Sequence, residues 1–163
     1  MKNLPYLYEA GNSVKRWHTW PTLQEQSVAS HSWGVAMILK YIYPEATSVD
    51  MLMALTHDLA EYVTGDIPYP FKKRSPKVQD GVVDAEVDFE YSYGLPAPLP
   101  GGMMAKYLKW ADMFELLMFS VRETQMGNTK FFDTVRVAKA ALEEMGHPTD
   151  RARQLYNDFL GIL

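Results

Sequence analysis

The apolar residues of this chain recur at helical intervals almost throughout its length. Five of them illustrate the pattern, at successive spacings of three and four: Val78, Val82, Ala85, Phe89 and Tyr93. Such a spacing places the apolar side chains on one face of a helix. The alternation of apolar and polar residues that is typical of strands nowhere exceeds four residues, and there is no internal repeat or low-complexity tract. The sequence therefore predicts an all-α fold, a bundle of about seven helices.

Capping residues, prolines and glycines set the expected helix ends. Ser27 is a good N-cap, Ser75-Pro76 combines a cap with a proline at the first helical position, and Thr129 is expected to cap a later helix. Helices are expected over residues 4–13, 27–43, 47–62, 75–93, 103–126, 129–145 and 149–160, and loops over 16–26, 64–70 and 95–102.

Composition limits the class of protein. A length of 163 residues predicts a single domain, residues 1–163, with a core large enough to need no disulfide or structural metal. Hydrophobic residues make up 47% and charged residues 22% of the chain, which is ordinary for a soluble globular protein and argues against disorder. The chain has no cysteine, so disulfides, cysteine-based zinc sites and cysteine nucleophiles are excluded.

Charge and hydropathy also limit the partners. Sixteen Lys and Arg against twenty Asp and Glu give a net charge of −4, which disfavours binding along duplex nucleic acid. The N-terminal residues contain no continuous apolar stretch that would form a signal peptide. No segment approaches the roughly 20 apolar residues of a membrane span. We therefore expect a cytoplasmic protein with no membrane partner.

Three nearby polar residues point to a metal site. His57 is followed directly by Asp58, and Glu61 comes four residues after His57, so that His57 and Glu61 share a face of the expected helix. A neighbouring imidazole and carboxylate suit divalent zinc, manganese, cobalt, nickel or iron. A second histidine on another helix and one more carboxylate would complete four ligands. His31 and Asp112 stand where the helical pattern asks for apolar residues, although each alone is equally compatible with a hydrogen-bonded buried group or a surface residue.

These residues lie within a longer series of motifs. The segments are VASHSWGVAMI, ALTHDLAEYVTGDIPYPFKK and KWADMFELL. In this order they resemble the HD-domain metal-dependent phosphohydrolases, in which each member of the H…HD…D series lies on its own helix. The Arg16-Trp17 pair before the first histidine, and the G-D-x-P-x-P-x-K sequence after HD-x-x-E, are similar to the branch that contains the bacterial 5′-deoxynucleotidases. The resemblance covers residues 16–115.

The resemblance implies an HD-domain helical bundle with a divalent metal ion, which could be Co, Mn, Zn, Ni or Mg. The implied ligands are His31, His57, Asp58 and Asp112. Such an ion would polarise a phosphate oxygen and lower the pKa of a water molecule. Glu61 would act as general base or acid or orient that water. Asp66 would lie near the scissile phosphate and hold the arginine or the water.

The resemblance also implies two groups of substrate contacts. Three cations would bind the phosphates: Arg16, Lys72 and Lys109. Three other residues would shape the nucleoside pocket: Trp17, Thr19 and Pro70. A guanidinium group binds phosphate in a bidentate way. An indole can stack on a base or close off the sugar 2′ position, which would favour deoxyribose. The alternatives are solvated surface charges for the lysines and core packing for the indole. His18 and His147 are expected to be structural.

A narrower resemblance is to the small HD triphosphohydrolases of bacteriophages. It implies hydrolysis of dATP to deoxyadenosine and triphosphate, in the host cytoplasm if the chain is phage-encoded. The alternative is a 5′-deoxynucleotidase that releases phosphate from deoxynucleoside monophosphates, and the three cations favour the longer phosphate chain without deciding the question. A nucleotide sensor without turnover and a helical interaction module are further hypotheses, but every motif residue of the enzyme is present. The implied partners are a small nucleotide substrate and further copies of the chain, as a dimer or hexamer.

Overall fold

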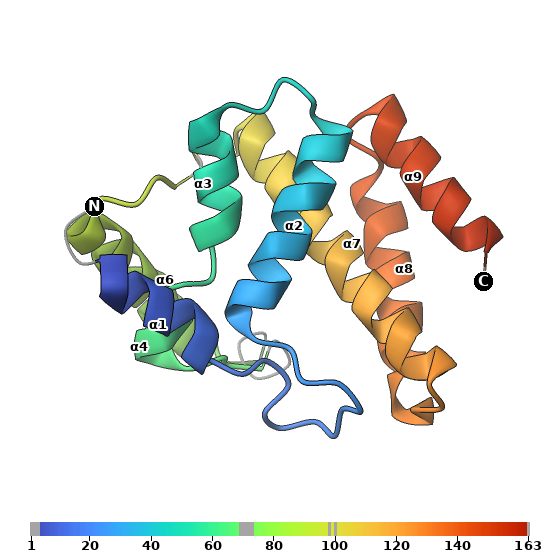
Figure 1. The fold of residues 1–163 in the computed structure, drawn as a ribbon, viewed down its shortest axis with the longest axis horizontal. Coiled ribbons are helices and arrows are strands. Elements are labelled where there is room, and N and C mark those ends of the chain that lie inside the picture. Colours follow the sequence, from blue (N-terminus) through green and yellow to red (C-terminus); the bar gives the residue numbers. More distant parts are fainter. Residues whose placement is uncertain (1–3, 69–73, 98, 100, 163) are drawn as a thin grey trace.

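The computed structural model describes residues 4–68, 74–97, 99 and 101–162, and this part of the chain is helical without strands (Figure 1). Seven helices have nine or more residues: α1 (Leu4–Ser13), α2 (Val28–Ile42), α3 (Ser48–Thr56), α6 (Pro76–Tyr93), α7 (Met103–Gln125), α8 (Phe132–Met145) and α9 (Asp150–Gly161). Two short elements complete the order: α4 (Glu61–Thr64) and the 3₁₀ turn η1 (Thr129–Phe131). The all-α prediction is confirmed. None of the described helices combines the length and apolar content that a membrane crossing requires.

Local sequence accounts for most helix ends. At the start of α2, the Ser27 hydroxyl accepts a hydrogen bond from the Ser30 N–H at 3.2 Å, and the Ser30 hydroxyl accepts one from the Ser27 N–H at 3.0 Å. This reciprocal pair satisfies backbone donors that the first helical turn leaves free. α6 begins with Pro76 at its first position, but the Ser75 side chain makes no capping hydrogen bond, so that part of the prediction is wrong. The helix ends at Gly94, whose φ of 62° is the left-handed conformation that glycine adopts without strain. Both helices therefore begin and end close to where the sequence predicts.

Two apolar cores organise the bundle. α2 and α7 lie side by side at its centre and bury the larger core with α3, α8 and α9, while α1, α4 and α6 lie together at one side (Figure 1). Four large side chains of the main core are at most 1% exposed: Trp110, Phe114, Leu117 and Leu39. Burying a side chain of this size contributes about 1.5–3 kcal/mol. α2 and α7 thus form the central pair against which α3, α8 and α9 pack.

The helix expected to continue to Tyr62 is broken, so that prediction is wrong. α3 ends at Thr56, and residues 57–60 form turns in which the Leu59 N–H donates to the Thr56 carbonyl at 3.0 Å, three residues back instead of four. The reason is tertiary packing. Ala54 is fully buried in the main core, whereas Leu59 is buried in the second core with residues of α1 and α6. The chain passes from one core to the other at this turn.

The start of α8 also differs from the prediction. Thr129 begins the 3₁₀ turn η1 and does not cap the helix, which begins at Phe132 without a side-chain cap. The cause is Phe131, which is fully buried. Its ring packs edge-on against the rings of Trp17 and Phe119, with centroids 5.0 and 5.8 Å away. Burial of this ring sets the entry to α8 in place of a polar cap.

The loop between α1 and α2 is fixed at both ends. At its base an antiparallel bridge joins Lys15 to Ser27. At its tip the carboxylate of Glu123, fully buried on α7, accepts hydrogen bonds from the backbone N–H groups of Leu23 and Gln24, both at 2.8 Å. The predicted loop is confirmed, and its tip is held by a buried charge.

Replacing Glu123 by Gln is expected to destabilise the fold in a pH-dependent way. Burial raises the pKa of Glu123, but hydrogen bonds from the Leu23 N–H, the Asn128 side chain and the Gln24 N–H outweigh it and hold the pKa below its ordinary value. This contribution is complete above the pKa of an unfolded glutamate, about 4.3, and is lost as the pH falls through the folded value. We expect E123Q to lower the free energy of unfolding by about 1–3 kcal/mol at pH 7, and by less at pH 3.

Urea unfolding at both pH values measures this difference. Glu144→Gln is the matched control, since Glu144 is exposed on α8, and a surface change of this kind alters stability by less than about 0.5 kcal/mol. An equal loss for E123Q at pH 7 and pH 3 would show that the pKa of Glu123 is not depressed.

Candidate metal centre and phosphate site

Three elements bring the four predicted metal ligands together. His31 is the fourth residue of α2, His57 and Asp58 follow α3, and Asp112 lies in the middle of α7. Donor atoms of His31, His57 and Asp112 lie within 4.8 Å of one another. His31 Nε2 is 3.3 Å from Asp112 Oδ1 and 3.5 Å from Asp58 Oδ2, and His57 Nε2 is 3.4 Å from Asp58 Oδ1. The donor atoms of His31, His57 and Asp112 therefore form one cluster, and the Asp58 carboxylate lies beside it, with an oxygen within 3.5 Å of each imidazole.

The hydrogen bonds of the two histidines fit a metal ion in that cluster. His31 Nδ1 bonds to Glu115 Oε2 at 2.5 Å, and His57 Nδ1 donates to the Ala54 carbonyl at 2.9 Å. Nε2 of each ring is buried and makes no hydrogen bond to any described residue. Because a carbonyl only accepts, Nδ1 of His57 carries the proton and Nε2 presents a lone pair. This nitrogen, His31 Nε2 once a metal ion displaces its proton, and the two carboxylates are a donor set suited to a divalent ion.

The electrostatics of the cluster favour a bound cation. Burial lowers the pKa of His31, but the carboxylates of Asp112 and Glu115 outweigh it and raise that pKa to about 9. Burial raises the pKa of Asp112, but His31 and Lys109 more than offset it and hold that pKa well below its usual range. The carboxylates that stabilise a positive charge on His31 would equally stabilise a metal ion beside it.

Arg16 borders the ligand cluster. One of its terminal nitrogens donates to Asp58 Oδ2 at 2.7 Å, and the side chain is only 15% exposed. Burial lowers the pKa of Arg16, but the carboxylates of Asp58, Asp112 and Glu61 outweigh it, so the group is a permanent cation. Its Nε is buried without a hydrogen-bond partner among the described residues. A guanidinium held in this way retains N–H groups for an anion beside the ligands.

Two further acidic residues lie next to the cluster. Glu61 begins α4 and is 7% exposed, and with Asp66 it lines a cleft of about 400 Å³ that Lys15 and His18 also border. Asp66 Oδ2 accepts a hydrogen bond from the backbone N–H of Trp17 at 3.1 Å and lies 3.7 Å from His18 Nδ1. Asp66 thus holds the backbone beside Arg16, while Asp58 holds the guanidinium group.

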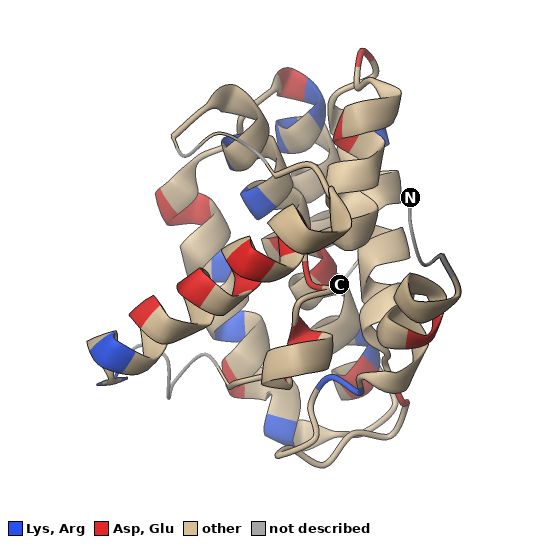
Figure 2. Ribbon diagram, turned by 90° about the vertical axis from the view of Figure 1, so that its left-hand side faces the viewer, with Lys and Arg blue, Asp and Glu red and all other residues tan. Residues whose placement is uncertain are grey.

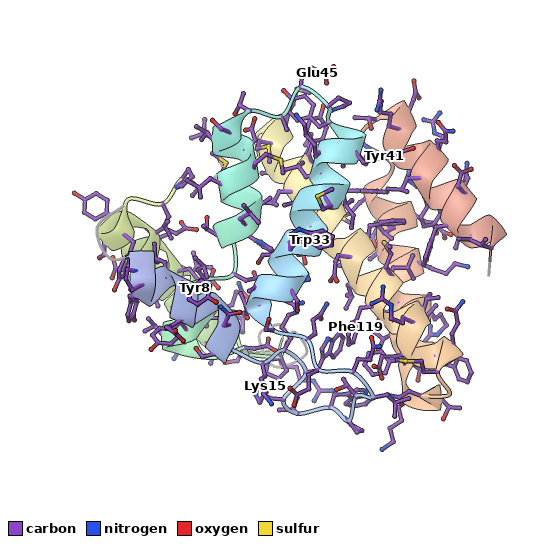
Figure 3. All side chains as sticks on the ribbon, in the orientation of Figure 1. Tyr8, Lys15, Trp33, Tyr41, Glu45 and Phe119 are labelled. Carbon is purple, nitrogen blue, oxygen red and sulfur yellow. The ribbon has the colours of Figure 1, made fainter. Side chains whose placement is uncertain are left out.

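Trp17 has a strained backbone held by several contacts. Its φ of 63° lies in the left-handed region, which costs a non-glycine residue about 1–3 kcal/mol. The ring stacks on Phe119 with centroids 5.6 Å apart and planes at 11°, and Nε1 donates to Gln26 at 3.0 Å. Phe119 lies between α7 and the loop that carries Trp17 (Figure 3). One face of the indole is therefore packed against Phe119, in line with core packing, the alternative role that the sequence analysis gives for Trp17.

The remaining predicted contacts have different positions. Lys109 Nζ lies 2.8 Å from Asp112 Oδ2 and its side chain is 61% exposed, so this cation borders the metal ligands. Thr19 is exposed in a turn that the Trp20 N–H closes by donating to the Trp17 carbonyl at 2.8 Å. Pro70 and Lys72 lie outside the described residues.

Sequence reasoning missed three polar residues that support the site: Gln26, Glu115 and Glu123. Glu115 lies one helical turn after Asp112, so its i+3 position on α7 was a usable signal. Glu123 lies three turns after Asp112 on the same face of α7. Gln26 gave no such signal, because its partner Glu115 is 89 residues away in the sequence.

Known proteins are similar to this chain in sequence. The chain matches the family described as 5′-deoxynucleotidase YfbR-like over residues 11–160. A dATP triphosphohydrolase of Salmonella phage PMBT28 is 42% identical over 119 residues, which cover 64% of this chain and 59% of the phage protein. The match thus spans less than two thirds of that relative. A 5′-deoxynucleotidase of Pasteurella multocida is 26% identical over 160 residues and is matched over 77% of its length, with 81% of this chain covered.

Solved structures share the fold. The cyanophage S-2L HD phosphohydrolase DatZ, solved with dA and one catalytic Zn²⁺ ion, superposes with a TM-score of 0.73 at 18% identity, covering 100% of this chain and 99% of the other. An HD-domain phosphohydrolase of Listeria innocua has a TM-score of 0.70 at 19% identity, covering 96% and 84%. The family match extends over most of the sequence, and the HD motif residues lie together in the fold. The chain therefore belongs to the family described as 5′-deoxynucleotidase YfbR-like.

Proposed function

We propose that the protein is a metal-dependent hydrolase of deoxynucleotides, and that its preferred reaction converts dATP to deoxyadenosine and triphosphate. The observation that carries this proposal is the convergence of two histidines and two aspartates with Arg16 at their edge. The phage dATP triphosphohydrolase at 42% identity supports the choice of substrate. The dA bound in the structurally similar DatZ supports it as well.

Each residue near the ligand cluster would have a separate task. His31, His57, Asp58 and Asp112 would hold a divalent ion, for which zinc in DatZ is a precedent. Such an ion supplies positive charge that polarises a phosphate oxygen and acidifies a water molecule. Glu61 would orient the water and accept its proton.

Arg16 would bind the phosphate through guanidinium N–H groups that Asp58 does not use. For dATP, water would attack the α-phosphorus and the bond to the deoxyribose 5′ oxygen would break. The hydroxyl group remains on the triphosphate, and the 5′ oxygen gains a proton.

The nucleoside and the outer phosphates would lie on either side of this centre. Asp66 would keep the Arg16–Trp17 backbone in place, and Trp17 with Thr19 would border the deoxyribose and base. Lys109, beside Asp112, would face the phosphates. From the motif, Lys72 and Pro70 are proposed as further contacts to phosphate and nucleoside, respectively.

Surface features bear on the partners. In the view of Figure 2, Lys and Arg residues of the described helices are interspersed with acidic ones. Together with the net charge of −4, this supports a small nucleotide as the partner in preference to duplex nucleic acid. Trp33, Met37 and Tyr41 follow one another at intervals of one turn on α2 and are 63%, 51% and 44% exposed. Figure 3 labels Trp33 and Tyr41 on this helix. This apolar stripe supports the proposed homo-oligomer, a dimer or hexamer. The cytoplasm is proposed as its location. Light scattering coupled to size exclusion measures the size of the oligomer.

Product analysis over a panel of nucleotides tests the proposed function. With Co²⁺ we expect dATP to be turned over fastest, with deoxyadenosine and intact triphosphate as the products. The analogues dGTP, 2-amino-dATP and ATP should react at least about tenfold more slowly, because each leaves a polar group unpaired or crowded in a pocket shaped for dATP. Comparable turnover of dGTP would remove the base preference.

The second candidate is a general 5′-deoxynucleotidase, which the family description and the Pasteurella relative favour. Faster release of phosphate from dAMP than of triphosphate from dATP in the same panel would establish it. A protein that binds metal and nucleotide without forming either product would instead be a sensor. One that binds no metal would be a helical interaction module.

A further inference from the structure

We propose that Glu115 and Gln26 are positioning residues that link the metal ligand His31 to Trp17, so that the metal site and the nucleoside pocket depend on one hydrogen-bond chain. The proposal rests on the function proposed above and adds how the two halves of the site are coupled.

The chain consists of three hydrogen bonds between four side chains. Trp17 Nε1 donates to Gln26 Oε1 at 3.0 Å, and Gln26 Nε2 donates to Glu115 Oε1 at 2.8 Å. The other carboxylate oxygen, Glu115 Oε2, bonds to His31 Nδ1 at 2.5 Å. Each polar end of the amide and of the carboxylate thus has a different partner.

The direction of these bonds is set at the tryptophan. An indole N–H can only donate, so Gln26 must turn its oxygen toward Trp17 and its NH₂ group toward Glu115. A carboxylate accepts on both of its oxygens, so Glu115 accepts from Gln26 through Oε1, and His31 donates to Oε2 through Nδ1. This arrangement leaves Nε2 of His31 facing Asp58 and Asp112. Glu115 therefore selects the histidine tautomer that a metal ion requires, and Trp17 and Gln26 hold its carboxylate in position.

The packing of α2 against α7 leaves room for this chain. A Cβ atom at Gly34, three residues after His31, would lie 2.9 Å from Cγ of Glu115. Any larger residue at that position would displace the carboxylate. Gln26 is 7% exposed, His31 is fully buried and the Glu115 side chain is 13% exposed, so water competes little for these bonds.

The hydrogen-bond chain also affects the part of the site proposed to bind the nucleoside. The left-handed backbone of Trp17 is held by Asp66, and its ring is held by Phe119, by Phe131 and by the bond to Gln26. Of these contacts to the ring, only the Gln26 bond is a directional hydrogen bond. It fixes the direction in which the indole N–H points. Without it the indole edge is free to shift, and the surface offered to the sugar changes.

Gln26→Met tests the link because it contacts no metal ligand and keeps a side chain of similar length. We expect zinc affinity, measured by competition with a chromophoric chelator, to fall at least about threefold. Loss of a residue that hydrogen-bonds directly to a metal ligand typically lowers affinity about 10–100-fold, and Gln26 is one residue further away. We expect the dATP-to-ATP ratio of kcat/KM to fall about tenfold. Glu115→Gln should weaken zinc binding about 10–100-fold, because its new NH₂ group faces a donor.

Gln24→Met is the matched control, since Gln24 lies in the same loop with an exposed side chain. It should leave both quantities unchanged. If Gln26→Met fails to fold, Trp17→Phe removes the same indole donor and should weaken zinc binding in the same direction. Unchanged zinc affinity in a folded Gln26→Met or Trp17→Phe protein overturns the link. Failure of the wild type to bind zinc or hydrolyse nucleotides would instead overturn the proposed function.

Discussion

Replacing His57 by Ala, or Asp112 by Asn, is expected to remove nucleotide hydrolysis and bound metal together. Both side chains contribute donor atoms to the cluster that also contains His31. A metal ion is worth several kcal/mol of transition-state stabilisation, and a loss of about 4 kcal/mol corresponds to a rate about a thousandfold lower. We therefore expect at least this loss in kcat/KM for either variant. Metal content by mass spectrometry and product analysis by chromatography measure the two effects.

The control for the aspartate is Asp133→Asn, a surface residue whose side chain is 88% exposed. It should keep full activity and metal content. Circular dichroism should show unchanged helix content in all three variants, because the ligands stand beside the main core and do not build it. A folded His57→Ala or Asp112→Asn protein that kept more than about a tenth of its activity, a barrier change under about 1.4 kcal/mol, would show that the cluster is not the catalytic centre.

Helix positions could be predicted because their signals are local, and the residues of the candidate metal site could be predicted because they match the H…HD…D series of the resembling family. The Ser27 cap and the Ser75-Pro76 start lie within a few residues of the helices that they begin. His31 and Asp112 were visible as polar residues in apolar helical stretches, and the structure shows both beside His57. These features depend on short-range spacing, which the sequence displays directly.

The wrong and missing parts depend on contacts between distant segments. α3 ends at Thr56 because Leu59 is buried in the second core with residues of α1 and α6, and nothing near Leu59 in the sequence indicates this. The bonds from Gln26 to Glu115 and from Leu23 to Glu123 join residues 89 and 100 positions apart. Such pairs cannot be read from periodicity.

One helix nevertheless organises the site in a regular way. On α7 the successive spacings are three, four and four residues for the side chains that face α2 and the loop before it: Asp112, Glu115, Phe119 and Glu123. These spacings place them in a row along one face. In order along the row, they contribute to the metal cluster, bond to His31, stack on Trp17 and hold the loop tip. The rigid pairing of α2 with α7 therefore positions the loop that carries Arg16.

Arg16→Ala is expected to lower kcat/KM about 10²–10³-fold while the metal stays bound. A fixed donor aimed at charge that develops in the transition state is worth a loss of this size, and we expect kcat to fall together with a rise in KM. In the wild type, Asp58 Oδ2 lies 2.7 Å from a guanidinium nitrogen of Arg16. Removing the guanidinium group frees this oxygen, so metal affinity should not fall. This combination separates Arg16 from the ligand variants, which lose metal and activity together.

Arg16→Lys should recover only part of the activity. An ammonium group is a single point charge and cannot bind Asp58 and a phosphate with the fixed geometry of a guanidinium. Arg153→Ala is the control, since Arg153 pairs with Asp150 at 3.5 Å on the surface and is 61% exposed, and it should leave kcat and KM unchanged. Zinc titration and steady-state kinetics on dATP measure the result. If Arg16→Ala lost its metal, or kept kcat/KM within about tenfold of the wild type, Arg16 would be a support for Asp58 and not a phosphate-binding residue.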